Sequence, residues 1–159
     1  MKKVFVSIPL KGRSKEDIEE SLKKIEEAVK GLIDKDVEVL HQKVEDLPDF
    51  DKGDEGFEDN LEFLAKDIEL MADADYFATI DSNWDFRHCS LEEDIFRRYK
   101  GANWEEKRDY IMKFSLNIIA PDVVKKEREE AKKIFRMDFK DEPNAVERAE
   151  YYEEQENKD

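Results

Sequence analysis

The sequence predicts an α/β fold in which a small parallel sheet is flanked by helices. Two short β-prone runs, residues 2–8 and 37–41, enclose an amphipathic helical stretch. This strand–helix–strand order favours a right-handed unit with parallel strands. A third β-prone run, residues 76–80, is followed by a polar loop and another helix start. We therefore expect a sheet of parallel strands with helices between them.

The first helix has a start signal and a stop signal. Ser14 and Asp17 have the spacing of a capping box, and Gly31 is a plausible C-terminal stop after Lys30. Its apolar residues recur at spacings of four, three and four: Ile18, Leu22, Ile25 and Val29. This pattern predicts one buried helix face.

The second helix follows a long acidic loop. Residues 43–59 carry Pro48, Gly53 and Gly56, and loops of this length in compact domains are usually functional or mobile. The helix then runs from about Glu58 to Ala72. Its apolar residues lie on one side: Leu61, Leu64, Ala65, Ile68 and Met71.

The third strand leads to the most informative segment. Ser90 is an expected N-cap and Glu93 completes a capping box, which gives Glu93 a structural role. Glu92 then lies in the first helical turn, just past the carboxyl end of a strand, where open α/β sheets bind ligands. The helix dipole would keep that carboxylate ionised, as a nucleophile requires. The alternative is a solvated carboxylate at a helix start.

Two more carboxylates are candidates for the same edge of the sheet. Asp67 lies eight residues before Asp75, so it sits ~12 Å along the helix axis towards the carboxyl edge. Asp85 lies in the loop after the third strand, with Asp81 as its rival. The alternative for Asp67 is a solvated charge on the helix surface. The alternative for Asp81 and Asp85 is that they only form a turn.

Other loop residues are candidates for binding a substrate. Trp84 and Phe86 can stack on a base, form a hydrophobic lid or make an oligomer contact. His88 and Cys89 are adjacent potential metal ligands, but without partners they are a weak metal signal, so no metal is expected.

The first loop, Ser7 to Arg13, leaves its strand at the same edge and contains Pro9. Ser7 and backbone amides can hold a sugar hydroxyl there, and Lys11 or Arg13 can meet a phosphate. The alternative is an ordinary turn between a strand and a helix.

The C-terminal part differs in composition. An apolar run at residues 111–119 is a candidate last strand, and Pro121 starts a charged helix to about Phe139. Its thin apolar stripe comprises Val123, Val124, Glu127, Ala131, Ile134 and Phe135. Asn144 with Glu147 is a candidate cap for a short final helix. We expect a domain at residues 1–120 and a charged helical extension at residues 121–159.

Charge excludes several classes of partner. Of the 159 residues 45% are charged, the net charge is −15, and residues 45–75 hold thirteen acidic residues and two lysines, a local net of −11. Such a surface repels nucleic acid and anionic membranes. The single cysteine excludes an intrachain disulfide, and no signal peptide or membrane-length apolar run is seen. We expect a cytoplasmic protein.

Several segments together resemble the nucleoside 2-deoxyribosyltransferase-like proteins, and in particular a branch common in phage and bacterial genomes. The resembling pieces are residues 3–14, residues 68–76, residues 84–89 leading into Leu91 and Glu92, and Tyr99. They occupy roughly the first 100 residues. The resemblance implies a Rossmann-like parallel sheet flanked by helices, no cofactor and a homo-oligomer.

The resemblance also implies a reaction and site residues. Family members of known activity cleave the N-glycosidic bond of deoxynucleosides or deoxynucleotides. Glu92 matches the nucleophile of the family, or Glu93 does if the alignment is shifted by one residue. Asp67 matches a residue that binds or protonates the base, and Asp85 matches a residue that contacts the base. Relatives usually have glycine where this chain has His88, and we expect the imidazole to narrow the pocket.

We therefore expect a deoxyribosyltransferase or N-glycosidase acting on a deoxynucleoside or its monophosphate, with a carboxylate nucleophile. Two alternatives stay open: a non-catalytic protein that binds nucleotides or nucleotide-derived signals, and an acidic interaction protein with a basic partner.

Overall fold

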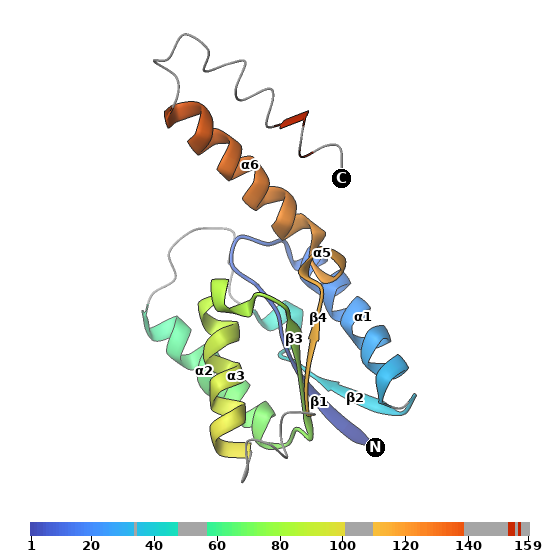
Figure 1. Ribbon diagram of the computed structural model, residues 1–159. Helices are drawn as coiled ribbons and strands as arrows, with labels where there is room; N and C mark the ends of the chain where they lie inside the picture. The colour runs from blue at the N-terminus through green and yellow to red at the C-terminus, as the bar shows by residue number, and fades with distance from the viewer. Residues whose placement is uncertain (34, 48–56, 101–109, 139–152, 155, 157–159) are drawn as a thin grey trace. The chain divides into compact units, whose positions relative to one another are not determined.

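The chain forms a four-stranded sheet in which every pair of neighbouring strands is parallel. The computed structural model describes residues 1–33, 35–47, 57–100, 110–138, 153, 154 and 156. The strands are β1 (Lys2–Ser7), β2 (Val37–Leu40), β3 (Tyr76–Ile80) and β4 (Ile111–Phe114), in the order β2-β1-β3-β4 (Figure 1). The expected α/β class with a small parallel sheet is confirmed.

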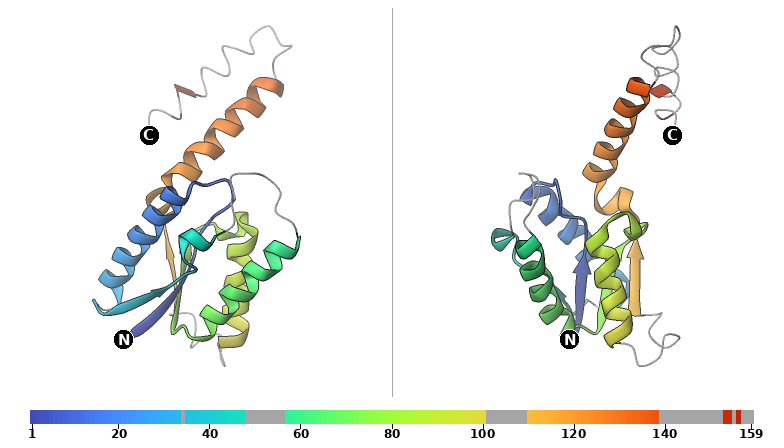
Figure 2. Two further views of the ribbon diagram at one scale, coloured as in Figure 1. Left: turned by 180° about the vertical axis from the view of Figure 1, so that it is seen from behind. Right: turned by 90° about the vertical axis from the view of Figure 1, so that its left-hand side faces the viewer.

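Helices cover both faces of this sheet. The described residues contain the helices α1 (Lys15–Leu32), α2 (Phe57–Ala72), α3 (Arg87–Lys100), α5 (Leu116–Ile119) and α6 (Pro121–Asp138), with short 3-10 turns η1 (Val44–Asp46) and η3 (Asn83–Asp85). The helices that cover the sheet are the first of these, up to α5. Figure 1 shows α1 on one side of the sheet and α2 with α3 on the other, and the left view of Figure 2 shows the same layers from behind.

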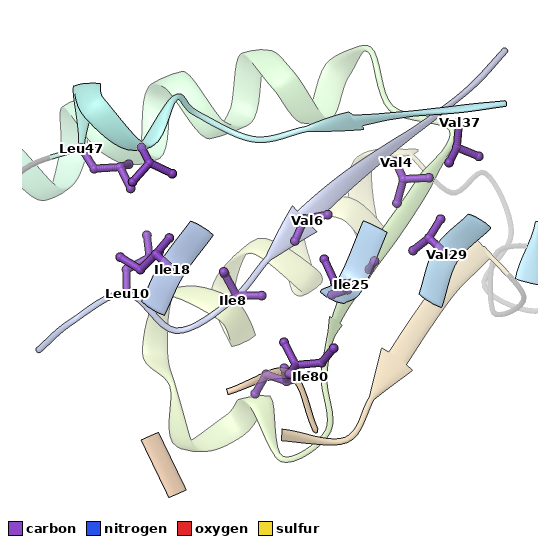
Figure 3. Packing of buried hydrophobic residues seen from close by; sticks show 13 residues of the cluster. Val4, Val6, Ile8, Leu10, Ile18, Ile25, Val29, Val37, Leu47 and Ile80 are labelled. Carbon is purple, nitrogen blue, oxygen red and sulfur yellow. The ribbon is translucent and has the colours of Figure 1, made fainter. Parts of the chain in front are cut away.

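Side chains along β1 point alternately to the two faces of the sheet, and the core is divided into two clusters accordingly. Val4 and Val6 belong to a cluster with Ile25 and Val29 of α1 (Figure 3). Phe5 points the other way, into a cluster with side chains of α2 and α3. Because side chains alternate along a strand, Ser7 lies on the same face as Phe5, beneath α2 and α3.

The first helix forms as expected at its start. Ser14 is the N-cap, and its Oγ accepts a hydrogen bond of 3.1 Å from the Asp17 amide. The end of the helix lies beyond the expected stop: Gly31 is helical, Leu32 is the last residue and Ile33 is the C-cap. A Cβ on Gly31 would meet nothing within 4 Å, so neither crowding nor backbone shape requires glycine there.

The second helix buries a different face from its apolar one. Leu61 is 49% exposed and Ile68 is 42% exposed, whereas Asp67 is only 3% exposed. Met71 is the one member of the apolar side that enters the core. The helix is therefore turned so that a carboxyl group faces the sheet.

The third helix begins earlier than expected, and the capping box at Ser90 is wrong. Because α3 starts at Arg87, Ser90 is inside the helix and Glu92 is in its second turn rather than its first. Glu93 does not reach back to cap the helix. Its carboxylate binds Asn83 (3.0 Å), Arg97 (3.0 Å) and Lys113 (3.2 Å) and so connects α3 to η3 and β4.

The chain divides into two compact units, Met1–Pro121 and Asp122–Asp159. The expected last strand is present as β4, and the charged helix is present as α6. Most of the acidic loop, residues 48–56, and the candidate cap at Asn144 lie outside the described residues. Within the described ranges, no helix combines the length and the apolar character of a membrane span.

Candidate functional site

A group of buried polar side chains lies at the carboxyl edge of the sheet, between β1 and β3. The strand order reverses direction there, because β2 lies on one side of β1 and β3 on the other. Ligands of open α/β sheets bind at such a switch point. Ser7 ends β1 and pairs in register with Thr79 of β3, and both side chains are buried.

Glu92 is the centre of this group. It projects from α3 towards the sheet with only 1% of its surface exposed. Ser7 Oγ donates a long hydrogen bond of 3.4 Å to Glu92 Oε1. Oε2 is buried and has no partner of ordinary hydrogen-bond geometry among the described residues. An orphaned buried oxygen is costly, and such groups occur where a ligand or water completes the site.

Burial, and then the charge of Asp67, raise the pKa of Glu92 well above its usual value. Burial therefore favours the protonated form of this carboxyl group over the ionised form. This corrects the expectation that a helix dipole keeps Glu92 ionised. The dipole acts within the first turn, and Glu92 lies beyond it in a setting that excludes water.

Asp67 approaches the same position from α2. Gln42, which follows β2, donates hydrogen bonds from Nε2 to Asp67 Oδ1 (2.8 Å) and to the Phe63 carbonyl (3.0 Å). Burial raises the pKa of Asp67 to about 6, while hydrogen bonds from Gln42 and from Glu92 favour its ionised form. Asp67 is thus the member of the pair that carries the negative charge.

Glu92 and Asp67 titrate as a pair. Each shifts the pKa of the other, and their interaction favours a proton on Glu92 and a charge on Asp67. Two carboxyl groups that share a proton in a dry setting can exchange acid and base roles.

His88 and Cys89 line the same group. His88 Nε2 donates to the Ile8 carbonyl at 3.0 Å, since a carbonyl only accepts, and lies 3.7 Å from Glu92 Oε1. Burial of the ring nitrogens lowers the pKa of His88 to about 4, so the contact with Glu92 is not an ion pair at neutral pH. Burial raises the pKa of Cys89, which remains a thiol.

The loop after β3 presents a different set of side chains. Trp84 is 75% exposed and Asp85 is also exposed, so Asp85 does not join Glu92 and Asp67. Asp81, its rival, has a structural role: its Oδ1 accepts from the Leu116 amide at 2.8 Å and starts α5. Ser82 has a φ of 56°, a left-handed conformation that is strained for serine and fixes the turn.

The loop after β1 is held by the protein itself. The guanidinium of Arg13 is buried and donates to the Pro9 carbonyl (2.8 Å), the Asp17 carbonyl (3.2 Å) and Ser21 Oγ (2.6 Å). These bonds direct Arg13 to α1 rather than to a phosphate. Pro9 is buried, and it contributes its carbonyl to this arrangement.

Sequence reasoning missed two polar side chains at this edge of the sheet. Gln42 follows β2 at the ligand edge, and that position was a signal that could have been used. Thr79 gave no signal, because a threonine inside a β-prone run is ordinary. Its Oγ1 is buried and has no hydrogen-bond partner among the described residues.

The buried carboxyl groups of Glu92 and Asp67 are suited to proton transfer. Within the described ranges, no three His, Cys, Asp or Glu side chains are arranged to hold a metal ion. Asp67 and Glu92 do not point into separate solvent, as they would if the carboxylates served only an acidic interaction surface.

Comparison with known proteins found no family model, no curated protein and no solved structure that matches this chain.

Proposed function

We propose that this protein cleaves or transfers the N-glycosidic bond of a deoxynucleoside or deoxynucleoside monophosphate. The observation that supports this most strongly is the pair of buried carboxyl groups, Glu92 and Asp67, at the switch point of the sheet. A carboxylate nucleophile with a second acid is what glycosidic cleavage with a covalent intermediate requires. The two residues are also the ones that the family resemblance singles out.

The proton shared by the pair accounts for both chemical roles. Glu92 passes its proton to Asp67 and attacks the anomeric carbon as a carboxylate, while the C–N bond breaks towards the base. Asp67 delivers the proton to the leaving nitrogen. Water then attacks the glycosyl ester and gives one proton to Asp67, which restores the pair, or a second base takes the sugar.

Other side chains of the site have matching roles. Ser7 donates to Glu92 Oε1 and so orients the nucleophile. Gln42 holds Asp67 from the opposite side. Trp84, exposed on the turn at the ligand edge, provides a face on which a base can stack.

The test is release of free base by the purified full chain from each common deoxynucleoside and its 5′-monophosphate, followed by chromatography. We expect Glu92→Gln and Asp67→Asn to lower kcat/KM by about a hundredfold or more. Glu93→Gln is the matched control, because Glu93 is adjacent in sequence but binds Asn83, Arg97 and Lys113.

A covalent intermediate gives a second readout. With a 2′-fluoro-arabinosyl nucleoside, which slows both steps by destabilising the oxocarbenium-like transition state, intact-protein mass spectrometry should show one added sugar on the wild type and none on Glu92→Gln. No base release from any substrate, together with unchanged nucleotide binding by Glu92→Ala, would rule the proposal out.

A non-catalytic binder is the second candidate, and one observation favours it. A protonated Glu92 cannot attack carbon, but it can donate a hydrogen bond to a ligand. Calorimetry with the same nucleosides and nucleotides separates the two functions. Binding with fully recovered, unaltered ligand indicates the binder.

A further inference from the structure

The imidazole of His88 lies beside the carboxyl group of Glu92 and is the more exposed of the two. His88 is in the first turn of α3, one helical turn before Glu92, and its Nε2 is 3.7 Å from Glu92 Oε1. The side chain of His88 is 32% exposed, whereas that of Glu92 is 2% exposed. A sugar whose anomeric carbon reaches Glu92 Oε1 therefore also contacts His88, because a sugar ring is wider than the distance between the two side chains.

The contacts of this imidazole fix its orientation and its tautomer. Nε2 lies 3.0 Å from the Ile8 carbonyl oxygen, and because a carbonyl only accepts, Nε2 carries the proton. Cys89 Sγ is 3.6 Å from the same nitrogen. The ring of Phe63 meets the imidazole edge to face, with centroids 6.1 Å apart and an interplanar angle of 83°. In a neutral ring with its proton on Nε2, the other nitrogen, Nδ1, is a hydrogen-bond acceptor.

Nδ1 of His88 is an acceptor that the protein does not use. Its polar contacts with described residues all involve Nε2, so Nδ1 has no hydrogen-bond partner among them. Burial lowers the pKa of His88 to about 4, so at pH 7 only about one ring in a thousand carries a second proton. Nδ1 can therefore accept a hydrogen bond from a hydroxyl group of a ligand, but it offers no proton to a phosphate.

The charged groups near His88 do not favour an anion. Asp67 carries the negative charge of the carboxyl pair. The buried cation of the loop after β1, Arg13, donates its hydrogen bonds to that loop and to α1. Two exposed lysines, Lys11 and Lys43, lie in the loops at this edge of the sheet, and they are the rival partners for a phosphate.

From this geometry we propose that His88 determines specificity: its Nδ1 accepts a hydrogen bond from a hydroxyl group of the substrate's sugar. The site then prefers a nucleoside to the nucleotide that is phosphorylated at that hydroxyl. A phosphate ester would replace the donor with oxygens that only accept, beside a lone pair and a carboxylate. The inference rests on the proposed function in taking the ligand to be a nucleoside, and it decides between the nucleoside and the monophosphate.

The test measures binding to the full chain without turnover. Carbocyclic deoxynucleosides, in which a methylene replaces the ring oxygen, cannot form an oxocarbenium ion and remain intact. By calorimetry, we expect the carbocyclic analogue of a deoxynucleoside to bind at least about tenfold more tightly than its 3′- or its 5′-monophosphate. His88→Phe keeps a ring but removes both nitrogens, so it should bring this ratio to about one with wild-type circular dichroism. His88→Asn, whose amide oxygen can replace Nδ1 as the acceptor, should keep most of the preference.

Removal of the hydroxyl group from the ligand completes a double-mutant cycle. A carbocyclic analogue that lacks the 3′- or the 5′-hydroxyl should bind the wild type about tenfold less tightly, whereas His88→Phe should bind it as well as the parent analogue. Arg87→Gln is the matched control, because Arg87 is exposed and adjacent to His88 in α3. It should leave every ratio within about twofold of the wild type.

Tighter binding of both monophosphates by the wild type overturns the inference, and its loss in Lys11→Gln or Lys43→Gln would identify the lysine that binds the phosphate. Equal losses of affinity in the wild type and His88→Phe, when the hydroxyl is removed, overturn it as well. Base release without a preference for the nucleoside refutes the role of His88 alone. A preference that depends on His88, without base release from any substrate, refutes the reaction and supports the role of His88.

Discussion

Replacing Asp67 with asparagine should stabilise the protein at neutral and alkaline pH. Burial raises the pKa of Asp67 from 3.8 to about 6. The folded state therefore holds this proton more tightly than the unfolded state, and stability is lost as pH rises from about 4 to about 6. This rise in the pKa of Asp67 corresponds to a loss of about 3 kcal/mol in the free energy of unfolding, at about 1.36 kcal/mol for each pH unit. The asparagine side chain would remain neutral at every pH, and its carbonyl would keep the hydrogen bond from Gln42.

Urea unfolding of both proteins between about pH 4 and about pH 8 gives the magnitude. The difference in unfolding free energy should be near zero at the acid end and reach about 3 kcal/mol in favour of Asp67→Asn above about pH 6. The difference in unfolding free energy between the two proteins isolates the effect of Asp67, because other titrating groups affect both proteins equally. His41 and His88, whose pKa values burial lowers, destabilise both proteins as pH falls below their usual value.

Glu19→Gln is the control for general charge, because it removes one exposed negative charge from a chain of net −15. Its effect should be within about 0.5 kcal/mol at every pH. If Asp67→Asn gained no more stability than this control at about pH 8, the claim that the Asp67 carboxylate is buried at a cost to stability would be wrong.

Four further expectations test other parts of the fold. Arg13→Met should cost about 3 kcal/mol in urea unfolding, because the buried guanidinium makes three hydrogen bonds; a loss below about 1 kcal/mol would contradict its structural role. Ser14→Ala should cost about 1 kcal/mol by thermal unfolding, whereas Ser14→Asp should keep the cap. Cys89 should resist iodoacetamide in the folded protein and react fully in urea by mass spectrometry, since burial raises its pKa. An NMR titration should place the pKa of His88 at about 4, and an ordinary value would show that its nitrogens are solvated.

The strands and the edge that carries the site were predictable because they depend on local pattern. The position of Asp67 followed from the rise of a helix along its axis. The rotation of α2 was not predictable, because the helix has two sides that carry apolar residues. The one that packs on the core contains Phe63, Leu70 and Met71 together with Asp67. The start of α3 was placed four residues late, since Ser90 offered a standard cap while the left-handed Ser82 and the η3 turn gave no cue in sequence.

Both Glu92 and Glu93 lie inside α3, because the helix starts as early as Arg87. Which of the two carboxyl groups is buried therefore depends on the rotation of the helix about its axis. Glu92 and Glu93 are adjacent, and successive residues of an α-helix point about 100° apart. In the phase set by the turn between Ile80 and Arg87, Glu92 faces Asp67 and Glu93 faces Lys113. One residue removed from that turn would rotate the helix so that Glu93 took the buried position of Glu92 beside Asp67. The length of a six-residue connection, rather than the chemistry of either glutamate, thus decides which of them shares a proton with Asp67.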